Sequence, residues 1–179
     1  FAPLQQMQGR VFACHGNHDL EAPHVVASAF GKLGIRLLVD EEAVVDTPVG
    51  PVQLIGVDYK FRGAQEHVEA LSNALPRRDG HPRIVLLHNP GHFTFVPDGL
   101  GDLVLSGHTH GGQVGLVDLG LDTTMLSLFV RSMPDHGFWA EGRNRLYVNR
   151  GLGHYGFPLR IGVRAEEALL RVHLSGLAA

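Results

Sequence analysis

The chain has 179 residues, 44% of them hydrophobic, which is enough for one domain with a sizeable core. Its net charge of −3, without any basic run, excludes the electrostatic footprint of a nucleic-acid-binding protein. The single cysteine, Cys14, excludes an internal disulfide, and no apolar run approaches the roughly 20 residues of a membrane-spanning helix. The compartment stays open between a cytoplasmic and a membrane-peripheral location.

The first element is a predicted strand over residues 9–14, which are mostly apolar, and a polar segment follows it directly. Open α/β sheets place their chemistry at such strand ends. Asn17 can offer a carbonyl oxygen to a cation, and His18 can bind a metal or act as a general acid or base. His15 and Asp19 are additional polar candidates. An ordinary turn after a strand is the alternative interpretation.

The middle of the chain alternates predicted helices and strands, as in an α/β protein. The pattern predicts helices over residues 23–33 and 65–75, and strands over residues 35–39, 43–46, 52–58 and 83–90. The last of these strands delivers His88 at its exit, and Pro90 then stops the ladder. Asp58 closes an earlier strand and is interpreted as a cap or turn residue.

Two histidines stand one residue apart after a buried strand predicted over residues 102–105. His108 and His110 cannot share a helix face, because helical neighbours lie three or four residues apart. At a strand end both imidazoles can be aimed at one small volume, and the flanking glycines let the backbone turn sharply. Neutral imidazole is the commonest metal ligand in proteins. The alternative is a Gly-rich turn with two solvated histidines.

Three predicted strands therefore end in histidine or asparagine, at Asn17-His18, at His88 and at His108-Thr109-His110. By chance, the 12 histidines of the chain would not fall repeatedly at the ends of predicted strands. The three strand exits together predict a metal site.

The last third of the chain contains an apolar segment and several predicted strands. Residues 116–133 form either an apolar rim that meets a lipid-like phosphoester or a membrane surface, or a hairpin tip packed on the core. Strands are expected over residues 145–149, 159–163 and 169–174, the last two closing a second sheet. Arg150 is a candidate phosphate contact or a structural residue.

Taken together, these motifs resemble the calcineurin-like metallophosphoesterase family. Its signature blocks appear in order as Gly16-Asn17-His18-Asp19, an isolated His88, and Gly107-His108-Thr109-His110. The following Gly111-Gly112-Gln113, the segment over residues 147–153 and Pro158-Leu159-Arg160 near the end are similar to its bacterial membrane-associated branch. The resemblance implies an α/β fold in which a β-sandwich is flanked by helices, the four-layer αββα arrangement.

The resemblance also implies a function and a site. The activity would be metal-dependent hydrolysis of phosphomonoesters or phosphodiesters with two divalent metal ions, Mn, Fe or Zn. One metal ion would be bound by Asn17, His88 and His108. His110 would bind the second ion, and His18 would be the catalytic residue beside the scissile phosphate.

One departure leaves the function open. The family begins with D-x-H and G-D-x-x-D blocks, which provide most ligands of the first metal, and neither block stands at the start of this chain. We therefore expect residues 1–179 to be a single metallophosphoesterase domain whose N-terminal part is missing. The alternatives are a non-catalytic scaffold of the same fold and a hydrolase of lipid-linked or nucleotide-sugar pyrophosphates.

Overall fold

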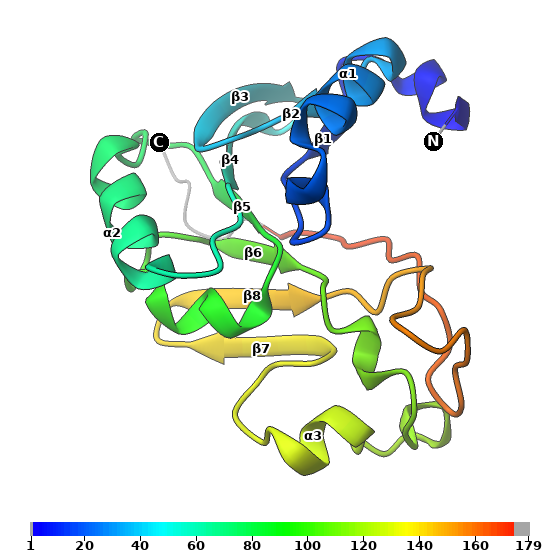
Figure 1. Ribbon diagram of the computed structural model, residues 1–179. Helices are drawn as coiled ribbons and strands as arrows, with labels where there is room; N and C mark the ends of the chain where they lie inside the picture. Colours follow the sequence, from blue (N-terminus) through cyan, green and yellow to red (C-terminus); the bar gives the residue numbers. More distant parts are fainter. Residues whose placement is uncertain (1, 174–179) are drawn as a thin grey trace.

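The computed structural model describes residues 2–173, and its centre is a mixed six-stranded sheet flanked by helices (Figure 1). The expected α/β fold is confirmed. The strands follow one another across the sheet in the order β3 (Glu41–Thr47), β4 (Gly50–Val57), β5 (Arg83–Leu87), β6 (Leu103–Ser106), β8 (Asn144–Val148) and β7 (Gly137–Glu141).

The inner strands β4, β5, β6 and β8 run parallel, and the edge strands β3 and β7 are antiparallel to their neighbours. The carboxyl ends of β5, β6 and β8 therefore meet at one edge of the sheet. His88 leaves β5 at this edge, and the segment with His108 and His110 leaves β6 beside it. Sheet topology thus brings two of the three predicted strand exits together.

The third strand exit belongs to a separate two-stranded parallel sheet, β1 (Phe12–Ala13) with β2 (Arg36–Leu37). The helix α1 (Pro23–Leu33) connects these two strands over the predicted residues. It ends at Gly34, whose φ of 69° is the left-handed conformation that glycine adopts without steric cost. Two short 3₁₀ helices, η1 (Ala2–Met7) and η2 (Asp19–Glu21), flank β1.

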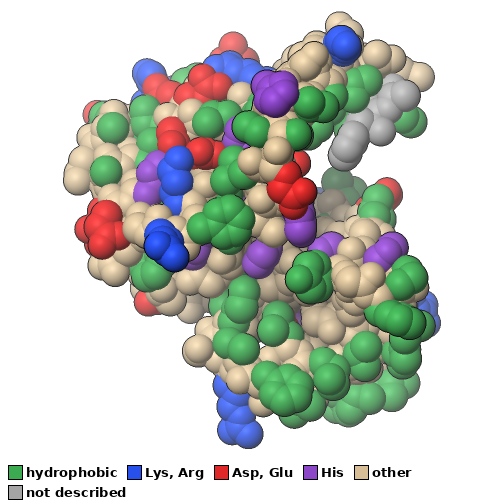
Figure 2. Space-filling view, in the orientation of Figure 1, with side chains coloured by type: hydrophobic (Ala, Val, Ile, Leu, Met, Phe, Trp, Pro, Cys, Tyr) green, Lys and Arg blue, Asp and Glu red, His purple; other side chains and the backbone are tan. Residues whose placement is uncertain are grey.

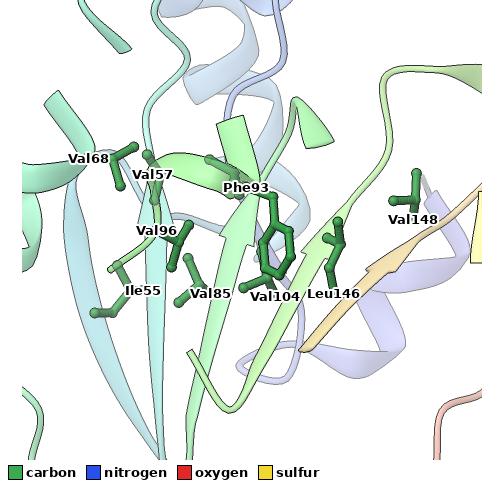
Figure 3. Close-up of a cluster of buried hydrophobic side chains, with 10 residues drawn as sticks. Ile55, Val57, Val68, Val85, Phe93, Val96, Val104, Leu146 and Val148 are labelled. Carbon is green, nitrogen blue, oxygen red and sulfur yellow. The ribbon is translucent and has the colours of Figure 1, made fainter. Parts of the chain in front are cut away.

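The hydrophobic core lies between the main sheet and the layer formed by α2 (Ala64–Ala74) and η3 (Pro90–Phe95) (Figure 3). Val104 and Leu146 from neighbouring strands are 0% exposed, and Val68 and Phe93 from the helical layer belong to the same buried cluster. Burying a side chain of this size contributes about 1.5–3 kcal/mol. The core fixes the strands whose ends carry the predicted site.

An antiparallel bridge between Gly115 and Thr124 joins the two ends of the first part of the segment over residues 116–133. Most of its large apolar side chains are exposed, so the alternative of a tip packed on the core is wrong. After η4 (His110–Gly112) the segment forms η5 (Val117–Leu119) and α3 (Met125–Phe129). Thr124 begins α3 with a capping box, in which its hydroxyl accepts from the Ser127 amide. Leu128 and Phe129 are exposed.

The prediction of strands over residues 159–163 and 169–173 is also wrong. Within the described residues, the first is reduced to a single bridge between Ile161 and Val114, and residues 169–173 have no regular structure; Leu174 lies outside the described residues. Ile161 and Leu169 are exposed, so their alternation with polar residues does not mark a buried sheet face. Among the described helices, none has the length and apolar character to cross a bilayer.

Candidate metal centre

Three of the four predicted metal ligands come together in space. The Nε2 atom of His88 lies 2.9 Å from Oδ1 of Asn17, and Nδ1 of His108 lies 3.1 Å from the same oxygen. The two ring nitrogens are 3.2 Å apart. A donor from the turn after β1 thus meets donors from the exits of β5 and β6, and we call Asn17, His88 and His108 the donor cluster.

The donor cluster fits a divalent transition metal. Two ligands at right angles on an ion with bonds of about 2.1 Å lie about 3.0 Å apart, close to the three separations observed here. Two imidazoles with one amide oxygen form a donor set that suits Mn, Fe or Zn. The amide is needed, since the described residues contain no group of three His, Cys, Asp or Glu placed to hold an ion.

The protonation state of the two imidazoles also suits a cation. Burial, with a smaller contribution from His108, lowers the pKa of His88 to about 4. Burial, followed by the proximity of His110, lowers the pKa of His108. Both rings are therefore neutral at neutral pH, and each has a nitrogen lone pair that can bind a metal ion.

The backbone around His108 and His110 is strained. His108, His110 and Gln113 have φ values of 69°, 52° and 57°, in the left-handed region that non-glycine residues rarely occupy. Such a conformation costs of order 1–3 kcal/mol and persists only where the surrounding structure imposes it. These three residues lie in the segment over residues 107–114, which we call the ligand loop.

His110 lies apart from the donor cluster but lines the same cavity. Its Nδ1 is buried and has no hydrogen-bond partner within the described part of the chain. Burial is also the main cause that lowers the pKa of His110. A neutral imidazole with a buried, unpaired nitrogen is chemically suited to a further ligand role.

His18 stands at the mouth of the cavity with its side chain 67% exposed. Its Nδ1 donates to Oε1 of Glu21 at 2.7 Å, so Nε2 is the ring nitrogen left for chemistry. The ring of Tyr155 lies 6.4 Å from the His18 ring, centroid to centroid. A solvent-accessible imidazole oriented by a carboxylate can transfer a proton.

The cavity itself has a volume of about 1110 Å³ and two kinds of lining. Histidines and Asn17 form one side, where Figure 2 shows histidine surfaces gathered near the middle of this face. The opposite wall is apolar and consists of Met125, Leu126, Phe129 and Met133. Among the described lining residues none is Lys or Arg. The described lining therefore offers no cationic side chain to an anionic ligand.

Several residues around the site were not found from the sequence. Tyr59 lies with its ring centroid 5.9 Å from that of His88 and 6.2 Å from that of His108. Asp58 accepts from Nδ1 of the buried His15 at 2.8 Å and pairs with Lys60. Aromatic and acidic residues at a strand exit were the available signal, but alone they do not identify a partner.

Asp19 and Arg150, two further candidates from the sequence, make local structural contacts. Oδ2 of Asp19 accepts from the backbone N–H of Gly16 at 2.7 Å and so fixes the turn that carries Asn17. Arg150 pairs with Glu166, at 3.1 Å, and it does not line the cavity. Of the two interpretations of Arg150, the structural one is therefore favoured.

Comparison with curated proteins finds similar chains among phosphoester hydrolases. The chain is 33% identical over 167 residues to phosphodiesterase YaeI of Escherichia coli (strain K12), an alignment that covers 90% of this chain and 57% of that protein. It is 34% identical over 176 residues to an uncharacterized metallophosphoesterase of Helicobacter pylori (strain J99 / ATCC 700824), covering 95% of this chain and 45% of the relative.

A third relative is UDP-2,3-diacylglucosamine pyrophosphatase LpxG of Chlamydia trachomatis, 29% identical over 153 residues, with 79% of this chain and 43% of the relative covered. The chain spans about half the length of these curated relatives. No protein-family model and no solved structure matches the chain.

Proposed function

The chain belongs to the calcineurin-like metallophosphoesterase family, and we propose that it hydrolyses phosphoesters with two divalent metal ions bound at the base of its cavity. Asn17, His88 and His108 would hold one ion, and His110 would contribute to the other. The donor cluster, with its separations of 2.9–3.2 Å, is the observation that carries the proposal.

The charge of the cavity supports a metal requirement. A phosphoester is an anion, and the described lining contains no lysine or arginine to neutralise it. Bound divalent ions supply that positive charge at the phosphoryl oxygens and activate the attacking water. A donor set of neutral imidazoles and an amide, which brings no negative charge of its own, leaves the ions strongly electropositive.

His18 is the residue of this chain proposed to act on the substrate. Glu21 fixes its Nδ1 proton, which leaves Nε2 free to face a phosphoester in the cavity. From there His18, protonated on both ring nitrogens, would donate its Nε2 proton to the leaving-group oxygen as the ester bond breaks. A positioned general acid of this kind contributes about 10²–10⁴-fold to a rate.

Hydrolysis of bis(p-nitrophenyl) phosphate separates this enzyme from a non-catalytic scaffold of the same fold. We expect the protein to release p-nitrophenol when Mn²⁺ is added, and EDTA or His108→Ala to remove the activity. His24→Ala is the matched control, because His24 is exposed on α1 and away from the cavity. Folded protein that binds Mn²⁺ but releases no product would favour the scaffold.

A second candidate substrate, an amphiphilic or lipid-linked pyrophosphate, is favoured by the apolar wall of the cavity. Met125 and Phe129 lie opposite the histidines, and Phe129 is 79% exposed. The relative LpxG is named for a diacylated substrate. Such a substrate would place its phosphates at the histidines and its acyl chains along α3. We therefore also propose that the protein makes peripheral contact with a membrane.

Liposome co-sedimentation tests the lipid candidate. We expect the protein to sediment with liposomes and the pair of changes Leu128→Asp and Phe129→Asp to release it, since both side chains are exposed on α3. Hydrolysis of bis(p-nitrophenyl) phosphate should stay unchanged in Leu128→Asp alone, since Leu128 does not line the cavity. If the unaltered protein does not bind liposomes, the lipid candidate is wrong and the phosphoesterase proposal stands.

A further inference from the structure

Arg160 connects the backbone of His110 to the loop over residues 150–153. Its Nη1 donates to the backbone carbonyl of His110 at 3.0 Å, and its Nη2 donates to that of Arg150 at 2.7 Å. Its Nε donates to the carbonyl of Gly153 at 3.0 Å. The hydrogen bonds found for its side chain in the described part of the chain all end on backbone carbonyls.

Arg160 shares this role with backbone hydrogen bonds from Ile161 to Gln113 and from Gly115 to Ile161, and with one from the Tyr155 N–H to Oε1 of Gln113. In the described structure, the segment over residues 150–163 contains no helix or strand, and the one β-bridge it forms with the ligand loop joins Ile161 to Val114. Gln113 adds weaker ties, since its side-chain amide donates to the carbonyl of Leu159 at 3.3 Å. A planar guanidinium with five donors can hold several carbonyls at once in one geometry.

The segment that Arg160 holds packs directly on the His110 imidazole. A Cβ atom added at Gly153 would lie 3.5 Å from Cε1 of His110. His110 itself has a left-handed backbone, with φ of 52°, which the surroundings must maintain. Arg160 therefore acts on His110 twice, through the carbonyl of the residue and through the loop beside its ring.

We infer that Arg160 is a positioning residue that fixes the His110 imidazole in the cavity. The inference rests on the proposed function for its consequence, which is that the ion held by His110 binds tightly only when Arg160 is present. Lysine keeps the charge but has a single ammonium group, so it cannot span the carbonyls of His110, Arg150 and Gly153 together. Loss of an orienting partner of a ligand typically weakens metal binding about 10–100-fold.

The test compares Arg160→Lys with Arg164→Lys in the metal-free protein. Arg164 lies four residues further along and its side chain is 83% exposed, which makes it a matched control. The readout is the long-range ¹H–¹⁵N spectrum of the imidazoles, with the His110 signals assigned by their loss in His110→Gln. We expect Arg160→Lys to shift or broaden the His110 signals and leave those of His88 in place.

Gly153→Val is the second variant, in case Arg160→Lys does not fold. Its Cβ would make an ordinary contact with the His110 ring, 3.5 Å from Cε1, and its methyl groups would extend beyond that contact, so the His110 signals should move. Unchanged His110 signals in a folded Arg160→Lys protein, or in Gly153→Val, would overturn the inference.

Calorimetric titration with Mn²⁺ then tests the consequence. The weaker of two binding events should lose about 10–100-fold in affinity in Arg160→Lys, while the tighter one is retained. If the unaltered protein binds no Mn²⁺, the proposed function fails, whereas the spectra still decide whether Arg160 positions His110.

Discussion

Metal binding should stabilise the fold, because the donor cluster joins the small sheet to the main sheet. Asn17 follows β1, whereas His88 and His108 leave β5 and β6. An ion that binds only the native state at a free concentration of 100 Kd contributes about 2.7 kcal/mol. For a chain of this size, 1 kcal/mol raises Tm by roughly 2–4 °C, so Mn²⁺ should raise Tm by about 5–10 °C.

The assay is thermal unfolding with and without Mn²⁺ for the unaltered protein, His88→Ala and His24→Ala. His88→Ala removes one of three donors and should abolish most of the Mn²⁺-induced increase in Tm, whatever it does to the metal-free Tm. His24→Ala should keep the full increase, because His24 is exposed on α1. An equal increase in all three proteins would refute the reasoning, since Mn²⁺ would then bind elsewhere.

Three further predictions concern single side chains. His18→Ala should lower the turnover of bis(p-nitrophenyl) phosphate by about 10²–10⁴-fold and leave the metal content, measured by elemental analysis, nearly intact; an unchanged rate would remove His18 from the mechanism. Burial alone would raise the pKa of Glu166, but hydrogen bonds from Tyr147 and Arg150 outweigh it and hold that pKa below the usual 4.5. Ionised Glu166 therefore stabilises the fold above about pH 4.5, and this contribution is lost as the pH falls through the lowered pKa. Denaturant unfolding of Glu166→Gln should show less loss of stability over that acid range than the unaltered protein, and parallel curves would contradict the prediction. Burial, with the negative charges of Asp19 and Asp58, raises the pKa of Cys14 to about 12, so the native thiol should react with a thiol-specific disulfide reagent only after denaturation; rapid native labelling would disprove it.

Much of the site could be predicted from the sequence, because strand exits are a local signal. A buried apolar run followed by a polar residue indicates where a strand ends, and parallel strands bring their carboxyl ends to one edge. His88 and His108 meet for this reason, although 20 residues separate them. Asn17 was a candidate from its own strand exit, but it comes from a different sheet, and the family resemblance assigned it to the same ion as His88 and His108.

The remainder depends on contacts that leave no pattern in the sequence. Arg160 stands in the family-like Pro158-Leu159-Arg160, but it contacts backbone carbonyls, which every residue has, so the sequence does not indicate its partners. The strands expected over residues 159–163 and 169–174 alternate in hydrophobicity, but the described part of the structure provides no neighbouring strand for them to pair with. β7 was missed although Phe138 and Trp139, with a turn at Gly142, give a hairpin signal before β8.

The most direct test of the account is the anomalous scattering of Mn²⁺ in crystals of the metal-loaded protein. The account predicts a peak within bonding distance of Oδ1 of Asn17, Nε2 of His88 and Nδ1 of His108, and a second peak beside the His110 imidazole. Crystals soaked at saturating Mn²⁺ that show no peak at the donor cluster, or peaks only on surface carboxylates, would contradict the central claim that this cavity is a metal-dependent phosphoesterase site.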